Sequence, residues 1–147
     1  MTKAKWSSCA ALAAFAALAV ACSGIQQGIQ AGKDGMNLAL IGQAYKSYCD
    51  TNKKGPANVD DLLKATTDQS QKDAIQLIKD GHFEAVFGVN VNDAGAGGSN
   101  AMLAWTKTPT NNTRVVLMAD TTSVKTLQEA DFQKQQKAKP GTGGGKQ

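Results

Sequence analysis

The sequence predicts an α+β domain in which one long amphipathic helix packs against a small antiparallel sheet of three or four strands. Two changes of pattern along the 147 residues carry this prediction. Between residues 35 and 52, apolar side chains recur three and four positions apart, as on one face of a helix. Between residues 83 and 91 they mostly alternate with polar ones, as in a strand with one buried face, and further strands are expected after it. Because so small a sheet is stable only when its apolar face is covered, the long helix is the expected cover.

The predicted helices follow one another in the first half of the domain. The apolar face of the long helix consists of Leu40, Ile41, Ala44, Tyr45 and Tyr48. Gly55-Pro56 ends this helix, since proline cannot continue the hydrogen-bond ladder. Asn58 is a good N-cap for a short second helix. Ser70 and Asp73 are spaced as in a capping box, which predicts a third helix that Gly81 closes.

The predicted strands follow, separated by segments rich in turn formers. The glycine-rich turn 93–100 and the hairpin connection 108–113 mark two of these separations. The strands are expected at 83–91, 101–107 and 114–120, with a short fourth strand at 124–127. A C-terminal helix is expected over 129–138, and residues 140–147 are expected to form a disordered tail.

The first 21 residues indicate an export signal. Lys3 and Lys5 precede an apolar run, 9–21, that is shorter than the about 20 apolar residues of a membrane-spanning helix. Loss of these two lysines reduces the cations from 16 to 14 against 12 acids, a net charge of +2. So small an excess argues against a nucleic-acid partner, which requires clustered basic residues.

The segment Leu18-Ala19-Val20-Ala21-Cys22, followed by Ser23, resembles a bacterial lipobox. The resemblance implies cleavage between Ala21 and Cys22, attachment of a diacylglycerol to the Cys22 thiol and usually acylation of the new amine. Residues 1–21 are then the signal peptide and the lipid anchors Cys22 to a membrane, each buried CH₂ contributing about 0.8 kcal/mol.

One position of this motif departs from the usual pattern. Ala19 stands where leucine is commonest, so ordinary cleavage after Ala19-Val20-Ala21 is the alternative and leaves a soluble secreted protein. Ser23 in the second mature position implies, by resemblance to proteobacterial lipoproteins, transfer to an outer membrane. The expected location is the bacterial cell envelope, either facing the periplasm or at the outer membrane.

The mature chain is expected to divide into a lipidated tether, 22–34, and a domain, 35–139. The tether prediction rests on the Gly, Gln and Ser content of 23–34. The alternative is that Ile25 and Ile29 begin a helix early.

The order of the motifs resembles that of a known fold. The stretch 37–48, with Gly55-Pro56 after it, resembles the soluble half of the helix of G-class type II secretion pseudopilins and of planctomycete pilin-like proteins. The stretches 101–105 and 114–120 are similar to the strand pairs that end many of the latter domains. The resemblance implies a pilin-like domain in which the helix lies across an antiparallel sheet.

Two departures from that family limit what the resemblance implies. A lipobox and tether stand in place of the long apolar helix that packs pilin filaments, so a usual filament subunit is not implied. Asp120-Thr121-Thr122-Ser123 stands where many relatives have Asp-Gly-His, and no calcium loop is evident, so metal binding is not implied either.

Cysteine, histidine and the aromatic residues are the first candidates for chemistry. Cys9 leaves with the signal and Cys22 is expected to carry the lipid, so Cys49 is the one remaining thiol. It is expected to be buried, and a reactive or dimerising thiol is the alternative. His82 is the only histidine, which excludes two-histidine zinc sites; a catalytic pair with Cys49 lacks a supporting motif. Tyr45, Tyr48 and Trp105 are expected in the core.

The other candidates have simpler explanations than chemistry. Asp50, Asp60 and Asp61 are expected as solvated carboxylates at helix ends, and the run 95–100 lacks the Lys-Ser/Thr ending of a phosphate loop. The lysines near the C-terminus are expected to be solvated, with anionic lipid or cell wall as alternative contacts: Lys134, Lys137, Lys139 and Lys146.

The sequence therefore predicts an envelope lipoprotein with a non-enzymatic structural or interaction role. No catalytic residue, cofactor, metal or small-molecule substrate is expected. The expected partners are the membrane, through the lipid on Cys22, and other envelope or secretion-system proteins. The alternatives are a lipoprotein that binds a small ligand or glycan and a cysteine-dependent enzyme.

Overall fold

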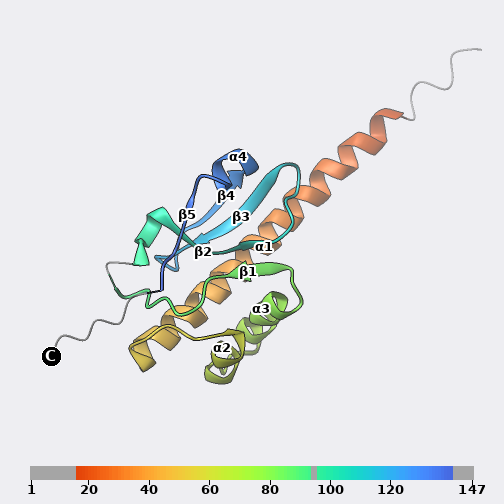
Figure 1. Ribbon diagram of the computed structural model, residues 1–147. Coiled ribbons are helices and arrows are strands. Elements are labelled where there is room, and N and C mark those ends of the chain that lie inside the picture. Colours follow the sequence, from red (N-terminus) through yellow and green to blue (C-terminus); the bar gives the residue numbers. More distant parts are fainter. Residues whose placement is uncertain (1–15, 94–95, 141–147) are drawn as a thin grey trace, which may run out of the picture.

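The computed structural model describes residues 16–93 and 96–140, with side chains from residue 30 onward (Figure 1). Its class is α+β, as predicted. Three helices come first: α1 (Ala16–Asn52), α2 (Val59–Ala65) and α3 (Gln69–Lys79). The second half holds the 3₁₀ turn η2 (Gly98–Asn100), the short helix α4 (Glu129–Phe132) and the strands β1 (Phe83–Ala85), β2 (Ala101–Thr106), β3 (Thr113–Met118), β4 (Val124–Gln128) and β5 (Gln136–Lys137).

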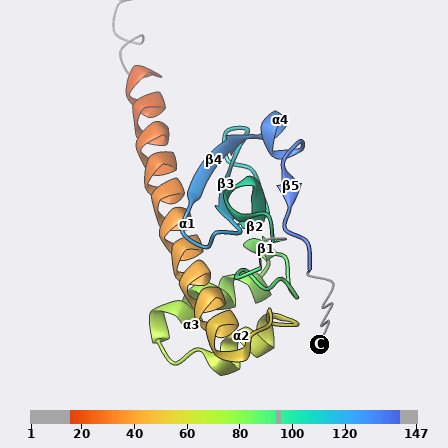
Figure 2. The same ribbon diagram turned by 90° about the vertical axis from the view of Figure 1, so that its left-hand side faces the viewer.

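The strands form one twisted sheet in the order β1-β2-β3-β4, and β5 lies beside β1 on the same edge of β2. Strands β1 to β4 pair antiparallel, and β5 pairs parallel with Ala101 and Met102 of β2. Helix α1 lies across one face of the sheet, while α4 lies on the other; α2 and α3 pack near the C-terminal end of α1 (Figures 1 and 2). The domain therefore has two apolar clusters, a large one under α1 and a smaller one under α4.

One stripe of α1 points into the larger cluster. Leu38, Ile41, Tyr45 and Cys49 are fully buried, at spacings of three and four that keep them on one face. Leu40 and Tyr48, expected on the same face, lie half-buried at its margins. The buried stripe is therefore rotated slightly from the predicted one.

Gly42 lets α1 approach the sheet closely. A Cβ atom at this position would lie 2.4 Å from the carbonyl oxygen of Thr121, in the turn between β3 and β4. Thr121 is buried and holds a left-handed φ of 63°, which fixes the direction of that carbonyl. A glycine is thus required at the point where the helix crosses the turn.

The segment 22–34, predicted as a flexible tether, is helical and belongs to α1, which begins at Ala16. The alternative of an early helix is the one that the structure shows. Gln30 donates a hydrogen bond one turn along to Asp34, at 2.9 Å. The carboxylate of Asp34 is also bonded to His82, so this turn is fixed to the domain. The segment from residue 16 to about residue 30 projects beyond the sheet (Figures 1 and 2).

The predicted strand 83–91 is wrong beyond Ala85. The Tyr45 hydroxyl donates to the carbonyl of Val86 and accepts from the N–H of Val89, so this backbone is bound to α1. Gly88 adopts a φ of 76°, which turns the chain. The segment after Ala85 is therefore a loop that caps the core.

The predicted C-terminal helix 129–138 ends at Phe132. Strand β1 pairs only with residues 104–106 of β2, so the beginning of β2 has a free edge. Residues 136–137 pair with that edge, and the N–H of Ala138 donates to the carbonyl of Met102 at 2.8 Å. Backbone pairing thus replaces the last turns of the helix. The predicted tail lies outside the described residues from 141 onward, as does most of the signal segment.

The caps of the two short helices show one prediction that is confirmed and one that is wrong. Asn58 caps α2, accepting from the N–H of Asp61 at 2.9 Å. Helix α3 is capped by Asp68, not by Ser70; the carboxylate accepts from the N–H of Gln71 at 2.9 Å. Aspartate and serine are both good N-caps. Which of them caps α3 therefore depends on where the chain turns between α2 and α3, and not on the residue type.

Candidate functional site

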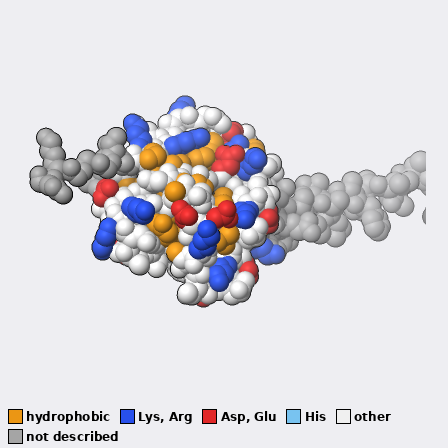
Figure 3. Space-filling model, turned by 60° about the horizontal axis from the view of Figure 1, so that its bottom comes forward, with side chains coloured by type: hydrophobic (Ala, Val, Ile, Leu, Met, Phe, Trp, Pro, Cys, Tyr) orange, Lys and Arg blue, Asp and Glu red, His pale blue; other side chains and the backbone are white. Residues whose placement is uncertain are grey.

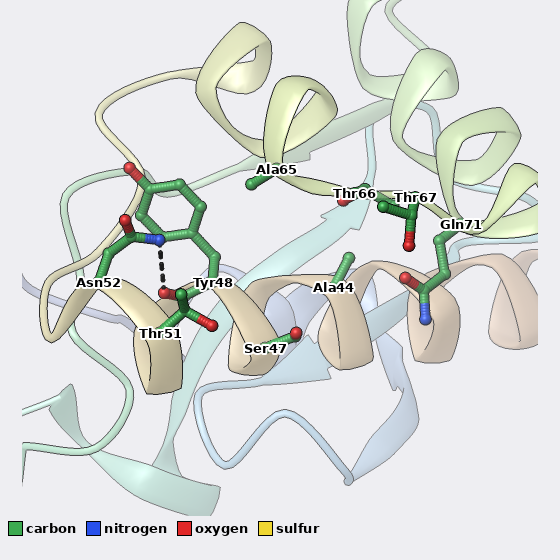
Figure 4. Close-up of a pocket in the computed structure, with 9 residues that line it drawn as sticks. All are labelled: Ala44, Ser47, Tyr48, Thr51, Asn52, Ala65, Thr66, Thr67 and Gln71. Carbon is green, nitrogen blue, oxygen red and sulfur yellow. Dashed lines mark hydrogen bonds between the residues drawn. The ribbon is translucent and has the colours of Figure 1, made fainter.

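A polar pocket lies between the C-terminal part of α1 and the connection from α2 to α3 (Figure 4). Its volume is about 110 Å³. Helix α1 forms one wall and the residues from Ala65 to Thr67 form the opposite wall, with Tyr48 at one end and Gln71 at the other. The lining residues are Ala44, Ser47, Tyr48, Thr51, Asn52, Ala65, Thr66, Thr67 and Gln71.

The local sequence explains why this pocket is polar. Ser47 and Thr51 are one turn apart on the exposed side of α1, next to the half-buried Tyr48. Thr66 is the C-cap residue that follows α2, and its hydroxyl donates to the carbonyl of Leu62 at 2.8 Å. Asn52 donates to the carbonyl of Tyr48 at 3.0 Å, which holds its amide beside the ring (Figure 4). Hydroxyl and amide groups therefore face one another across the pocket.

A second, more open groove of about 570 Å³ surrounds β1. Its walls combine Phe87 and Ile78 with the charged Glu84, Lys107 and Lys137. Its largest ring, Trp105, is buried: the indole N–H donates to Glu84 Oε2 at 3.0 Å. The ammonium group of Lys137 lies 4.7 Å from the ring centroid and covers it. The ring is therefore not available for stacking with a ligand.

Cys49 is buried, as expected. Its thiol lies 3.7 Å from the carbonyl of Val89, in the core beneath the loop after β1. Burial raises the pKa of the Cys49 thiol, which disfavours the nucleophilic thiolate. These surroundings are those of a core side chain.

The structure does not bring Cys49 and His82 together. His82 Nε2 lies 2.9 Å from the Oδ1 atom of the buried Asp34 carboxylate. Asp34 and Cys49 are both on α1, and their separation in sequence corresponds to about 22 Å along a helix axis at 1.5 Å per residue. The pair that is formed, Asp34 with His82, joins α1 to the start of β1 and was not expected from the sequence.

Each acidic candidate interacts with a different partner. Asp50 is exposed at the end of α1, where hydrogen bonds from Lys46 and Asn92 lower its pKa. Asp60 pairs with Lys79 at 3.0 Å, and Asp61 accepts from the backbone of Ala57 and donates its N–H to the cap. In the described part of the chain, no group of three or more His, Cys, Asp or Glu residues is arranged to hold a metal ion.

The turn 120–123 is closed by its own side chain. Burial acts to raise the pKa of Asp120, but hydrogen bonds from the Ser123 hydroxyl and from the N–H groups of Ser123 and Thr122 outweigh it and lower the pKa. These bonds use the carboxylate oxygens inside the turn. The carboxylate of Asp120 thus stabilises the turn between β3 and β4.

Charge is distributed evenly over the face drawn in Figure 3. Lysine and arginine side chains alternate there with aspartate and glutamate, around small apolar areas. This face lacks the single-sign surface that a nucleic-acid partner requires. Among the described helices, none has the length and apolar character to cross a bilayer.

Comparison with known proteins adds no family to these observations. No protein family, no curated protein and no solved structure matches the chain.

Two features of these sites were not predicted from the sequence. The polar pocket is formed by residues 44–52 and 65–71, and only the adjacent hydroxyls of Thr66 and Thr67, after a helix, signal it in the sequence. The Asp34–His82 contact joins residues 48 positions apart, and no local pattern marks such a pair.

Proposed function

We propose that the chain is a lipid-anchored lipoprotein of the bacterial cell envelope with a non-enzymatic structural or interaction role. The lipobox ending at Cys22 carries the proposal. The geometry of α1 supports it, because residue 22 belongs to the projecting part of that helix. At 1.5 Å per residue, Cys22 is about 18 Å along the helix from Asp34, whose carboxylate contacts His82 of the domain. A lipid at Cys22 holds the domain away from the bilayer and leaves its surface accessible.

The partner surface in this proposal is the sheet edge at β1. This strand is at the end of the sheet order, so no described strand pairs with its outer side. Val86 donates its N–H to the carbonyl of Leu103, which directs the backbone groups of the half-exposed Ala85 outward. An outward backbone beside a groove is suited to an added strand from another protein. The proposed partners are envelope proteins of a secretion or pilus-like assembly.

Crosslinking in isolated envelope membranes tests this proposal. The tagged, natively expressed chain is expected to enrich pseudopilins, a secretin or other assembly components. The Ala85→Pro variant removes an outward N–H without removing a β1–β2 hydrogen bond. Its enrichment of these proteins is expected to be at least tenfold lower than that of the wild type. Thr126→Pro on β4, the opposite edge, is the matched control and is expected to retain it.

Recovery of the protein alone from those membranes would contradict the interaction role. Equal loss in both proline variants would also count against the β1 surface, provided that thermal unfolding shows both variants to be folded.

A further inference from the structure

We propose that the polar pocket between α1 and the α2–α3 connection binds one edge of a neutral sugar ring. This inference is independent of the interaction role proposed above, since it rests on a different surface. It rests on one observation: uncharged hydroxyl and amide side chains from three segments line the same cavity, whose volume is about 110 Å³ (Figure 4).

The chemistry of the lining selects for hydroxyl groups. Serine, threonine and tyrosine hydroxyls both donate and accept hydrogen bonds, and so do asparagine and glutamine amides as a whole. A sugar hydroxyl has the same double capacity. No lysine, arginine, aspartate or glutamate lines the pocket. A phosphate or carboxylate would find no cation, and an ammonium group no carboxylate, so a charged ligand would lose hydration without compensation.

The hydrogen-bonding capacity of these side chains is largely unused. Thr66 and Asn52 each donate to a backbone carbonyl. Within the described residues, the side chains of Ser47, Thr51, Thr67 and Gln71 form no hydrogen bond with another protein group. Gln71 extends from α3 toward α1, and Thr67 lies near it on the opposite wall from Ser47 (Figure 4). A ligand with several adjacent hydroxyls can engage these groups together.

The size of the pocket limits the ligand to part of a ring. The pocket volume of about 110 Å³ is smaller than the roughly 300 Å³ at which drug-sized sites begin. The methyl groups of Ala44 and Ala65 and the ring of Tyr48 provide apolar contacts for sugar C–H groups. One edge of a pyranose fits this space, and the rest of a saccharide extends into solvent.

The test is to titrate sugars into the full-length chain and to follow its amide signals by nuclear magnetic resonance. The chain is held in micelles of a detergent that has no sugar head group. The probes are methyl β-glucopyranoside, methyl N-acetyl-β-glucosaminide and a chitotetraose. Both monosaccharides are expected to shift the amide signals of residues 47–52 and 65–71, with millimolar affinity. Glucose 6-phosphate is expected to bind at least tenfold more weakly, because its charge has no partner in the pocket.

Two substitutions separate binding from folding. Thr51→Val removes one exposed hydroxyl at constant shape, and Ser47→Ala removes another; the double variant is expected to weaken binding at least tenfold. Thr126→Val on β4 makes the same chemical change outside the pocket and is expected to leave binding within twofold.

Tighter binding of chitotetraose than of the monosaccharides supports the proposal with an envelope polysaccharide as the source, and equal binding supports it with a free sugar as the source. Absence of shifts at residues 47–52 overturns it. Equal binding of glucose 6-phosphate overturns the preference for a neutral ligand.

Discussion

Gly42→Ala is expected to lower the free energy of unfolding of the domain by about 1–3 kcal/mol. The added Cβ would lie 2.4 Å from the Thr121 carbonyl oxygen and 3.2 Å from the Leu117 side chain. The atom in closest contact belongs to backbone, so a side-chain rotation cannot relieve it. Alanine has the higher helix propensity by about 1 kcal/mol, so the expected loss is opposite in sign to that propensity. Urea denaturation followed by circular dichroism measures the difference.

Gly32→Ala is the matched control in the same helix. Gly32 is exposed, and nothing lies within 4 Å of a Cβ added there. Helix propensity then acts alone, and the variant is expected to be as stable as the wild type or more stable by up to about 1 kcal/mol. A Gly42→Ala protein as stable as Gly32→Ala would contradict the close contact between α1 and the β3–β4 turn.

Tyr45→Phe is expected to lower the free energy of unfolding by about 1–3 kcal/mol at neutral pH. Tyr45 is fully buried, and its hydroxyl bonds the carbonyl of Val86 at 3.1 Å and the N–H of Val89 at 3.3 Å. Phenylalanine keeps the ring and leaves two backbone groups of the loop without this partner. Chemical denaturation of both proteins at pH 7 measures the difference.

The same variant makes a prediction about alkaline pH. Burial raises the pKa of the Tyr45 hydroxyl in the folded protein above its ordinary value. The unfolded chain therefore releases this proton first, near pH 10, while the folded chain retains it. The stability contributed by Tyr45 is complete below about pH 10 and falls as the pH rises further, by at most about 1.4 kcal/mol per unit.

The stability difference between wild type and Tyr45→Phe is accordingly expected to shrink between pH 9.5 and 11. Burial also raises the pKa of Cys49, so both proteins are expected to lose stability together from about pH 8.5. A difference that stays constant across this range would show that the Tyr45 hydroxyl is not buried as described.

The parts of the fold that the sequence predicted are those with a local cause. The helix over 35–52, the cap at Asn58 and the strands near 101–106, 113–118 and 124–128 each follow from periodicity or capping chemistry within a few residues. Local rules suffice for these elements because their signals, the spacing of apolar residues and a capping side chain, lie within each segment itself.

The errors have causes that lie far along the chain. The strand from residue 83 stops early because Tyr45, about forty positions earlier, binds the backbone of Val86 and Val89. Residues 136–137 leave the helical pattern because β1 is too short to cover β2. The turn of α1 at Asp34 is fixed to the domain because the Asp34 carboxylate contacts His82. None of these contacts is visible in the spacing of nearby residues.

The candidate sites divide in the same way. The burial of Cys49 was predictable from its place beside the apolar face of a helix. The polar pocket was not, because Ser47 and Thr51 appear as ordinary solvent-facing helix residues until α2 and α3 fold over them. A pocket between elements requires their relative position, which a single sequence does not provide.

The intact mass of the native mature protein, extracted from envelope membranes, tests the lipoprotein proposal most directly. The expected mass is that of residues 22–147 plus a diacylglycerol, with or without an additional acyl chain, and Cys22→Ser is expected to abolish both the added mass and the membrane association. A mature protein whose mass equals its unmodified residues from Cys22 would contradict the account.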